Sequence, residues 1–231
     1  VGGVRRSALI SLSNLSDQRI RTAKTGDWWT TNPERALANN SVAYTEKPDP
    51  GIFMKEWLSL YESKSGERGI FSRASAQKKA AENGRRESNW DFGTNPCSEI
   101  ILRPNQFCNL TEIVVRAGDT VNTLTRKIKV ATLLGTIQST FTNFGYLRKI
   151  WQDNTEEERL LGVSLTGIMD SELLNGKETG LAKTLEKLKK VAVDCNKEYA
   201  EKFGINQSTA ITCVKPSGTV SQLVDSASGI H

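Results

Sequence analysis

Residues 95–99 read Asn95-Pro96-Cys97-Ser98-Glu99, and the interpretation of the whole chain depends on this stretch. In an extended backbone, side chains two residues apart project to the same side, about 6.6 Å from each other. Asn95, Cys97 and Glu99 would then present an amide, a thiol and a carboxylate to one sugar-sized molecule. Pro96 has no backbone N–H, so the segment is expected at a loop tip or a strand end. The same residues also fit an ordinary turn that Asn95 caps and that buries Cys97, and taken alone they favour this simpler interpretation.

Cys108 follows Cys97 by eleven residues, and two thiols that meet can carry two electrons as a dithiol–disulfide pair. A simple hairpin centred on Pro104 and Asn105 would place Cys108 opposite Ile101 rather than opposite Cys97. The spacing therefore allows the two thiols to reach a common pocket only if the turn between them is irregular.

Residues 215–221 read KPSGTVS and lie between a predicted strand and a predicted helix. Gly218 lets the backbone approach a ligand closely, and the N–H groups at the start of a helix favour anions. Thr219 and Gln222 have the spacing of a capping box. The segment therefore predicts either a phosphate-binding loop or an ordinary capped helix.

The composition is that of a globular chain with one large domain or two small ones: 231 residues, of which 37% are hydrophobic and 25% charged. These proportions argue against collagen, a coiled coil and a disordered chain. The net charge of +5 weakly favours polyanions such as nucleotides, although basic and acidic residues are interleaved. No apolar run approaches the roughly 18 residues of a membrane helix, and no signal peptide is visible. Because the chain starts at Val1 and stops at His231, we expect a piece of a longer protein.

Four cysteines and one histidine restrict the chemistry available to these residues. No cysteine pair has C-x-x-C spacing and the histidine is the last residue, so no metal site is expected. A catalytic Ser–His or Cys–His pair is all but excluded for the same reason. Cys195 lies on an apolar helical stripe and Cys213 in a short apolar strand, so both are interpreted as core residues. Thiols in a reducing compartment, the cytoplasm, are expected rather than disulfides.

Strand and helix patterns alternate along the chain, which predicts an α/β fold. Strands are expected over residues 4–12, 41–45 and 210–214, and two more within 99–115 around a turn at 103–106. Helices are expected over 52–61, 120–151, 181–203 and 219–224, the second of them interrupted by Gly135 and Gly145. A further short helix is expected within 63–89.

Taken together, the motifs resemble those of the catalytic subunit of ribonucleotide reductase, in the family's order. Besides residues 95–99, 108–110 and 215–219, the resemblance includes residues 3–8, 39–42, 66–73 and 159–170. Each motif is weak alone, but the set is specific and spans nearly the whole chain. Three features are most similar to the monomeric, adenosylcobalamin-dependent class II enzymes: the short gap between Cys97 and Cys108, the sequence GVRR at residues 3–6 and the sequence KPSGT at residues 215–219.

The resemblance implies part of a ten-stranded α/β barrel with a central finger loop. Residues 1–231 would be a part of this catalytic barrel domain, truncated at both ends. The implied activity is the reduction of ribonucleoside triphosphates to 2′-deoxyribonucleoside triphosphates, with adenosylcobalamin as cofactor and a thioredoxin-like protein as reductant. A monomer is implied, with neither nucleic acid nor a membrane as partner.

The resemblance also assigns roles to individual residues. Cys97 would become a thiyl radical after the cobalt–carbon bond of the cofactor breaks, and would remove the 3′ hydrogen of the ribose. Glu99 would take the proton of the 3′ hydroxyl, and Asn95 would hold the substrate hydroxyls. Cys108 would be one of the two thiols that reduce the radical intermediate. The substrate phosphates would be bound by Ser217, Gly218, Thr219, Val220 and Ser221.

Two redox groups of the family are missing from these residues. No cysteine precedes Cys97, although the family's second reducing thiol lies on an earlier strand, and the C-terminal cysteines that receive electrons from thioredoxin are also absent. We therefore expect the 231 residues alone to be inactive and the longer protein to be active.

Two alternatives stay open. The same fold could use another radical source, either a dimetal partner subunit or a glycyl radical, and could act on diphosphates or triphosphates. The chain could instead be a non-catalytic module that binds phosphate around Ser217 and uses no thiol.

Overall fold

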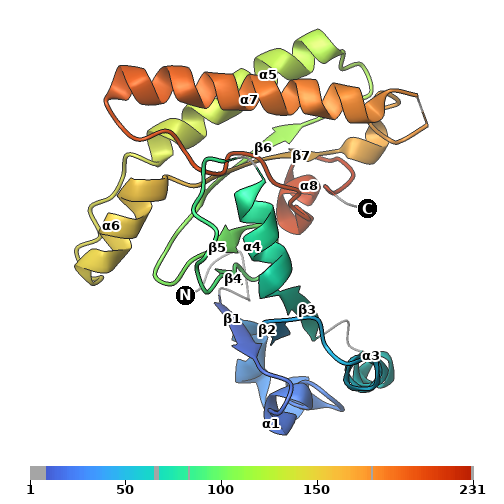
Figure 1. Ribbon diagram of the computed structural model, residues 1–231. Coiled ribbons are helices and arrows are strands. Elements are labelled where there is room, and N and C mark those ends of the chain that lie inside the picture. The colour runs from blue at the N-terminus through green and yellow to red at the C-terminus, as the bar shows by residue number, and fades with distance from the viewer. Residues whose placement is uncertain (1–8, 65–67, 83, 178, 230–231) are drawn as a thin grey trace. The chain divides into compact units, whose positions relative to one another are not determined.

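The computed structural model describes residues 9–64, 68–82, 84–177 and 179–229. The chain divides between Pro104 and Asn105 into two compact units. Figure 1 labels the main elements of both. The prediction that residues 1–231 are part of one barrel domain stays a prediction.

The first unit contains a parallel sheet with the strand order β1-β2-β3 (Figure 1). Its strands are β1 (Leu9–Ser13), β2 (Ala38–Tyr44) and β3 (Gly69–Ser72). The strand predicted over 4–12 lies partly outside the described residues, and the strand predicted over 41–45 is confirmed. The sequence does not predict β3, because four residues after a polar stretch carry too little pattern. Short helices α1 (Gln18–Arg21), α2 (Trp28–Thr31) and η1 (Pro33–Leu37) connect β1 to β2.

Side chains alternate between the two faces of this sheet, and a helix contacts each face. Helix α3 (Pro50–Ser63) meets one face, where the rings of Phe53 and Tyr44 lie 6.3 Å apart. Helix α4 (Arg73–Ala81), the short helix expected within 63–89, meets the other face. There a small core forms, with Ala43 packed against Phe71, Ala76, Ala80 and Phe92.

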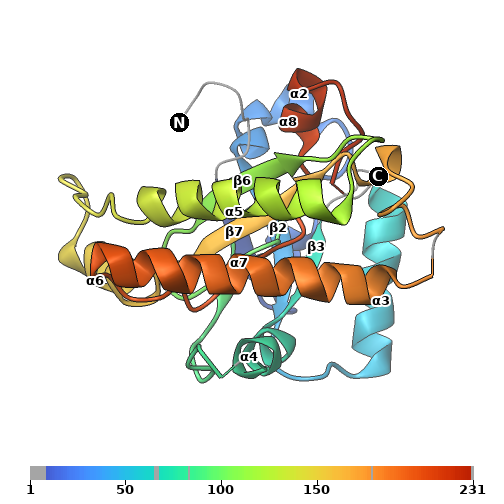
Figure 2. The same cartoon turned by 90° about the horizontal axis from the view of Figure 1, so that it is seen from above.

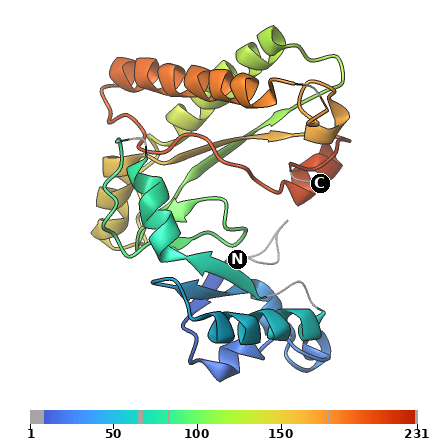
Figure 3. The ribbon, with the colours of Figure 1, turned by 45° about the vertical axis from the view of Figure 1, so that its right-hand side comes forward.

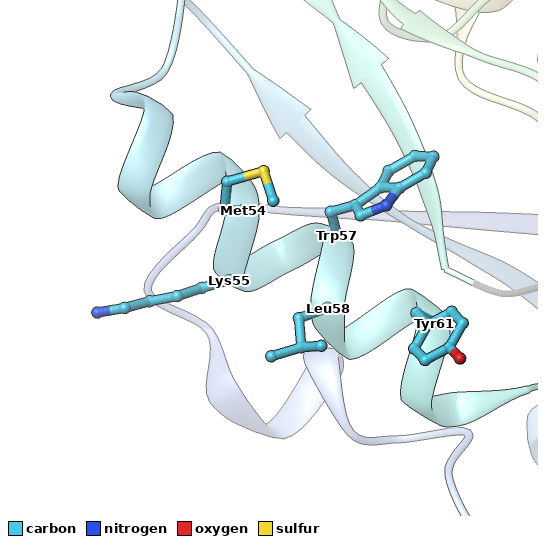
Figure 4. A pocket seen from close by; sticks show the side chains of 5 residues that line it. All are labelled: Met54, Lys55, Trp57, Leu58 and Tyr61. Atoms are coloured by element: carbon cyan, nitrogen blue, oxygen red, sulfur yellow. The ribbon is translucent and has the colours of Figure 1, made fainter.

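Helix α3 confirms the helix predicted over 52–61, but most of its apolar side chains are not buried. Glu56 is the one buried residue of α3, whereas Trp57, Leu58 and Tyr61 are between 53% and 76% exposed. Glu56 can be buried because arginines of the same unit pair with its carboxylate. Figure 4 shows the exposed side chains, which line a shallow pocket of about 310 Å³ together with Met54 and Lys55.

The second unit contains two parallel strands, β6 (Asn109–Val114) and β7 (Leu161–Thr166). The strand predicted over 210–214 is reduced to a single bridge between Thr212 and Val163. Its backbone still runs along β7, since Leu161 N donates to Ala210 O and Cys213 N donates to Val163 O. Figure 3 shows this segment, coloured red, beside β7.

Helices α5 (Val121–Gln138) and α7 (Leu181–Phe203) lie side by side across one face of β6 and β7 (Figure 2). The bounds of α7 are those predicted. The pattern over 120–151 forms two helices, because the chain leaves α5 after Gln138 and begins α6 (Lys149–Glu158) later. Gly135 does not interrupt α5; it is buried where the helix packs on β7, and a Cβ there would make an ordinary contact with Leu161 at 3.4 Å. None of the described helices is long and apolar enough to cross a membrane.

The two strands predicted within 99–115 do not form a hairpin with each other. Strand β5 (Ile101–Leu102) pairs antiparallel with β4 (Gly93–Thr94) in the first unit, whereas β6 pairs with β7 in the second. Both predicted strands are thus confirmed, but a simple hairpin between them is excluded, because each strand finds its partner elsewhere in the chain.

Asp119, just before α5, makes a pH-dependent contribution to the stability of the second unit. Burial raises its pKa, but hydrogen bonds from Lys127 Nζ, Arg116 N and Thr123 Oγ1 outweigh this, so the pKa is lowered overall. A lowered pKa stabilises the fold above the unfolded-state pKa, and this stabilisation is lost as the pH falls through the folded-state value.

We expect Asp119→Asn to reduce the free energy of unfolding by about 2 kcal/mol at pH 7, because hydrogen bonds to a charged group are lost. The difference from the unmodified chain should shrink below about pH 4. Denaturant unfolding at several pH values measures it. Asp153→Asn, on an exposed i,i+4 pair with Lys149, is the control and should cost less than about 0.5 kcal/mol. An equal loss at pH 7 and pH 3 would contradict the prediction.

Candidate functional site

Residues 95–98 form a turn between β4 and β5 instead of an extended segment. Ser98 N donates to Asn95 O at 2.9 Å, and Ser98 adopts a left-handed conformation with φ 64°. Pro96 occupies the second position of this turn, where its fixed φ is favoured. The expectation that an extended backbone aligns Asn95, Cys97 and Glu99 on one face was therefore wrong.

The side chain of Asn95 takes part in the turn, as the simpler interpretation of the sequence expected. Its Oδ1 accepts a hydrogen bond from Ile100 N at 3.0 Å, and Thr94 Oγ1 closes the loop by donating to Ile100 O at 2.9 Å. Cys97 is half-buried rather than buried, as is Glu99. The structure thus places the amide, the thiol and the carboxylate on one short closed loop.

Strand β2 fixes the position of this loop through Asn39. The Nδ2 group of Asn39 donates to the carbonyl oxygen of Pro96 at 2.5 Å, across 57 residues of sequence. Residues 39–42 belong to the resemblance, but no role for Asn39 was predicted, because the contact joins two segments far apart in the chain. Asn39 is therefore a positioning residue for the turn that carries Cys97.

Cys108 lies immediately before β6 in the second unit and is half-buried. The preceding residues are anchored to α6: Asn154 Nδ2 donates to Asn105 O at 3.2 Å, and the ring of Phe107 lies 4.7 Å from that of Trp151. All four cysteines belong to the described residues and none of them forms a disulfide. Since Cys97 belongs to the other unit, the meeting of the two thiols stays a prediction.

The alternation of side chains along β6 indicates which way Cys108 faces. Ile113 and Val115 belong to the core beneath α5 and α7, as do Leu161 and Val163 of β7. Residues of the other parity therefore occupy the opposite face of the sheet. Extended by one residue, this alternation puts Cys108 on the face that carries Ser164 and Thr166.

Helix α8 (Gly218–Leu223) confirms the helix predicted after residue 218, but its start differs from the prediction. Ser217 is the N-cap residue, in a left-handed conformation with φ 51°, and its side chain makes no capping hydrogen bond. The capping box predicted from Thr219 and Gln222 was wrong, because the helix begins before Thr219.

The five residues expected to bind phosphate divide into two groups. Ser217 and Ser221 are buried, and their hydroxyl groups are used inside the protein: Ser221 Oγ donates to Gly218 O at 3.0 Å. Gly218 and Thr219 are exposed, and Val220 is half-buried. A ligand could therefore reach the backbone and side chain at 218–219 without any rearrangement.

The chain returns after α8 and closes on its own start, so that residues 215–229 form one loop. Gly229 N donates to Pro216 O at 3.2 Å, and a Cβ on Gly229 would lie 2.0 Å from Lys215 O. Only glycine fits such an approach. Arg116 fastens the far side of the loop by donating to the carbonyl oxygens of Val224 and Asp225. The 215–229 loop is thus a fixed structure at the end of β7 (Figure 1).

No protein-family model matches the chain. Among proteins of known function, the chain is similar to an adenosylcobalamin-dependent ribonucleoside-triphosphate reductase of Lacticaseibacillus paracasei, with 30% identity over 262 aligned residues. This match covers 100% of the chain and 33% of the relative. Reductases of the same name from Lactobacillus gasseri and Lactobacillus delbrueckii subsp. bulgaricus are 30% and 27% identical, again over the whole chain. The chain spans about a third of the length of these relatives.

Solved structures agree with the sequence matches. A crystal structure of a B12-dependent (class II) ribonucleotide reductase has a TM-score of 0.73 and 25% identity, over 96% of the chain and 34% of that structure. The class Id ribonucleotide reductase alpha subunit of Actinobacillus ureae has a TM-score of 0.61 and 15% identity, over 95% of the chain and 48% of that subunit. The second likeness concerns the fold alone.

Proposed function

We propose that this chain, which is related along its whole length to catalytic subunits of ribonucleotide reductase, is the part of a ribonucleoside-triphosphate reductase that carries its radical thiol. The enzyme would convert ribonucleoside triphosphates to 2′-deoxyribonucleoside triphosphates. The observation that carries the proposal is the closed turn at 94–100, which contains Asn95, Cys97 and Glu99. The similarity to ribonucleoside-triphosphate reductases extends over the whole chain, so this turn lies within the similar region.

The α/β fold shared with reductase subunits would form part of a ten-stranded barrel around this turn. Both parallel sheets support this arrangement, since parallel strands connected by helices are the units from which α/β barrels are built. In the second unit, the two long helices cover one face of the sheet. By the alternation of side chains, the other face carries both polar and apolar residues, among them Glu112, Ser164 and Thr166. Such a face suits the lining of a barrel that holds a nucleotide.

Each group on the turn would perform one step on the ribose. The Cys97 thiyl would take the 3′ hydrogen atom, and Glu99 would accept the proton of the 3′ hydroxyl while Asn95 holds the substrate hydroxyls. A carboxylate can serve as a general base when its pKa suits the step. The 2′ hydroxyl would then take a proton from one of the reducing thiols and leave as water, and Cys97 would finally return the hydrogen atom to the 3′ carbon. Because radicals react with solvent and with other side chains, the site has to be closed during these steps.

Cys108 would supply reducing electrons after water has left. Removing the 2′ oxygen requires two electrons, and two thiols provide them by forming one disulfide. Cys108 is one such thiol, and the other would come from outside these residues. A thioredoxin-like protein would then reduce the disulfide, and a monomer would suffice for catalysis.

The substrate phosphates would lie at the 215–229 loop. Of the predicted residues Ser217, Gly218, Thr219, Val220 and Ser221, the exposed pair at 218–219 offers N–H groups and a hydroxyl to an anion. The buried hydroxyls would instead support the loop.

Adenosylcobalamin, which the relatives are named for, would supply the radical chemistry that activates Cys97. The one pocket described above, on α3, does not fit this cofactor. The pocket on α3, about 310 Å³, is too small for a corrin ring with its side chains, and no group of three His, Cys, Asp or Glu side chains among the described residues could hold a metal. Only residues that act on the substrate are therefore assigned roles.

The test is a reductase assay on the natural protein that contains these 231 residues, with adenosylcobalamin, a dithiol reductant and no second subunit. We expect deoxyribonucleoside triphosphates to form, and triphosphates to be better substrates than diphosphates. A requirement for a second subunit or a glycyl radical would support the alternative radical sources. Phosphate binding without any reduction would support the non-catalytic module. The 231 residues alone should be inactive, because they lack the second reducing thiol.

A further inference from the structure

Two buried hydroxyl groups join the end of β7 to the 215–229 loop. Thr166 Oγ1 and Ser217 Oγ lie 2.5 Å apart, and Thr166 Oγ1 lies 3.2 Å from the carbonyl oxygen of Ala227. Gly229 N donates to Ser217 Oγ at 3.0 Å. Thr166 and Ser217 are 0% and 2% exposed. The hydrogen bonds thus form one continuous chain inside the second unit.

The direction of each hydrogen bond follows from the available protons. A hydroxyl group has one proton to donate, and a carbonyl oxygen can only accept. Thr166 therefore donates to Ala227 O, and Ser217 donates to Thr166. Ser217 in turn accepts the N–H of Gly229. Both hydroxyl protons are used within the protein, so neither hydroxyl can donate to a phosphate oxygen without breaking this chain.

This series of hydrogen bonds also accounts for the unusual backbone conformation at Ser217. A left-handed conformation is unfavourable for a residue with a Cβ, and surrounding contacts have to hold it. The bonds from Ser217 Oγ to Thr166 and Gly229 provide such contacts. They fix the point from which the exposed Gly218 and Thr219 project.

We propose that Thr166 and Ser217 are positioning residues that keep the 215–229 loop in the shape that receives the substrate phosphates, and that neither hydroxyl is itself a phosphate ligand. The inference rests on the proposed function, and it departs from the resemblance, which assigned Ser217 to phosphate binding. It also gives a role to Thr166, for which the sequence predicted none.

The experiment measures steady-state kinetics of the natural protein with a ribonucleoside triphosphate. Thr166→Val removes the hydroxyl and keeps the side-chain shape, leaving Ser217 without its acceptor. We expect KM to rise about tenfold, as for a buried group left unpaired, while kcat changes less than about twofold because only binding is affected. Thr166→Ser should restore KM. Thr212→Val, the same change at an exposed position beside β7, should leave KM unchanged.

A double variant separates positioning from direct phosphate binding. Ser217→Gly keeps the left-handed backbone without the hydroxyl. If both hydroxyls act through the same series of hydrogen bonds, removing the second one has no further effect. The KM is then about the same for Thr166→Val, Ser217→Gly and the double variant. Additive increases, or an increase for Ser217→Gly alone, would make Ser217 a phosphate ligand and overturn the inference.

If Thr166→Val fails to fold, Asp170→Ala tests the same segment, because Asp170 Oδ2 accepts the N–H of Ala227 at 2.8 Å from the exposed side. Positioning predicts a raised KM for this variant, and direct binding by Ser217 predicts none. A wild-type KM for Thr166→Val in an active enzyme would refute this inference alone. If the unmodified protein does not reduce triphosphates, the proposed function fails. Calorimetric binding of inorganic triphosphate then tests the positioning role by itself. We expect Thr166→Val to weaken this binding about tenfold, and unchanged binding would overturn the inference.

Discussion

Cys97→Ser is expected to abolish the reduction of ribonucleoside triphosphates by the natural protein, to below the limit of detection. A serine hydroxyl holds its hydrogen much more strongly than a thiol, so the variant cannot form the radical that attacks the ribose. The substitution is close to isosteric, and Cys97 sits half-buried at a turn that is held by hydrogen bonds among Asn95, Ser98 and Ile100. The fold should therefore persist while the chemistry disappears.

A matched control is available in the same chain. Cys213 is also half-buried, but it lies beside β7 and has no assigned role, so Cys213→Ser should keep wild-type turnover. Circular dichroism and thermal unfolding of both variants check that the fold is unchanged. Turnover by a folded Cys97→Ser protein would remove the thiyl mechanism and leave only the fold assignment.

Local patterns predicted the long elements of this fold well. Helix α7 has the bounds that its apolar stripe indicates, because 23 residues give the periodicity many repeats and glycines stand at both ends. Strand β3 was not predicted, and the partners of β5 and β6 were not predicted either. A strand's partner depends on the rest of the chain, and nothing within Ile101–Leu102 or Asn109–Val114 specifies it.

The candidate site shows the same division between local and distant information. The residue types at 95–99 and 215–221 were sufficient to mark both segments. Their geometry was not predictable, because Asn39 fixes one segment and Thr166 fixes the other, each from a distant strand. Motif spacing therefore located the reactive groups, whereas contacts across 57 and 51 residues determine how they are presented.

Glu56→Gln is expected to destabilise the first unit by about 3–5 kcal/mol, the usual cost of removing one partner from a buried ion pair. Glu56 is 0% exposed, and its two oxygens accept from Arg68 Nε at 2.5 Å and from Arg21 Nε at 3.1 Å. Arg68 is itself 4% exposed, so the substitution would leave a buried positive charge uncompensated. Denaturant unfolding of the chain measures the loss, and Glu62→Gln, at an exposed position of the same helix, should cost less than about 0.5 kcal/mol.

The phenol of Tyr44 gives an independent readout of the same change. Burial raises the pKa of Tyr44, and the negative charge of Glu56 raises it further, while Arg68 and Arg21 lower it. Neutralising Glu56 should therefore lower the pKa of Tyr44, which ultraviolet titration can follow. An unchanged titration would mean that the carboxylate is screened from the core.

Replacing the whole group distinguishes a charge effect from a packing effect. If the cost of Glu56→Gln comes from the stranded charge of Arg68, then changing Arg21, Glu56 and Arg68 together to methionine removes that cost. The triple variant should have a free energy of unfolding that exceeds that of Glu56→Gln by more than about 2 kcal/mol. A triple variant that is instead the less stable of the two would mean that the arginines stabilise the unit through their hydrogen bonds to Ser13 and Leu15. The buried ion pair would then be a net stabilising interaction.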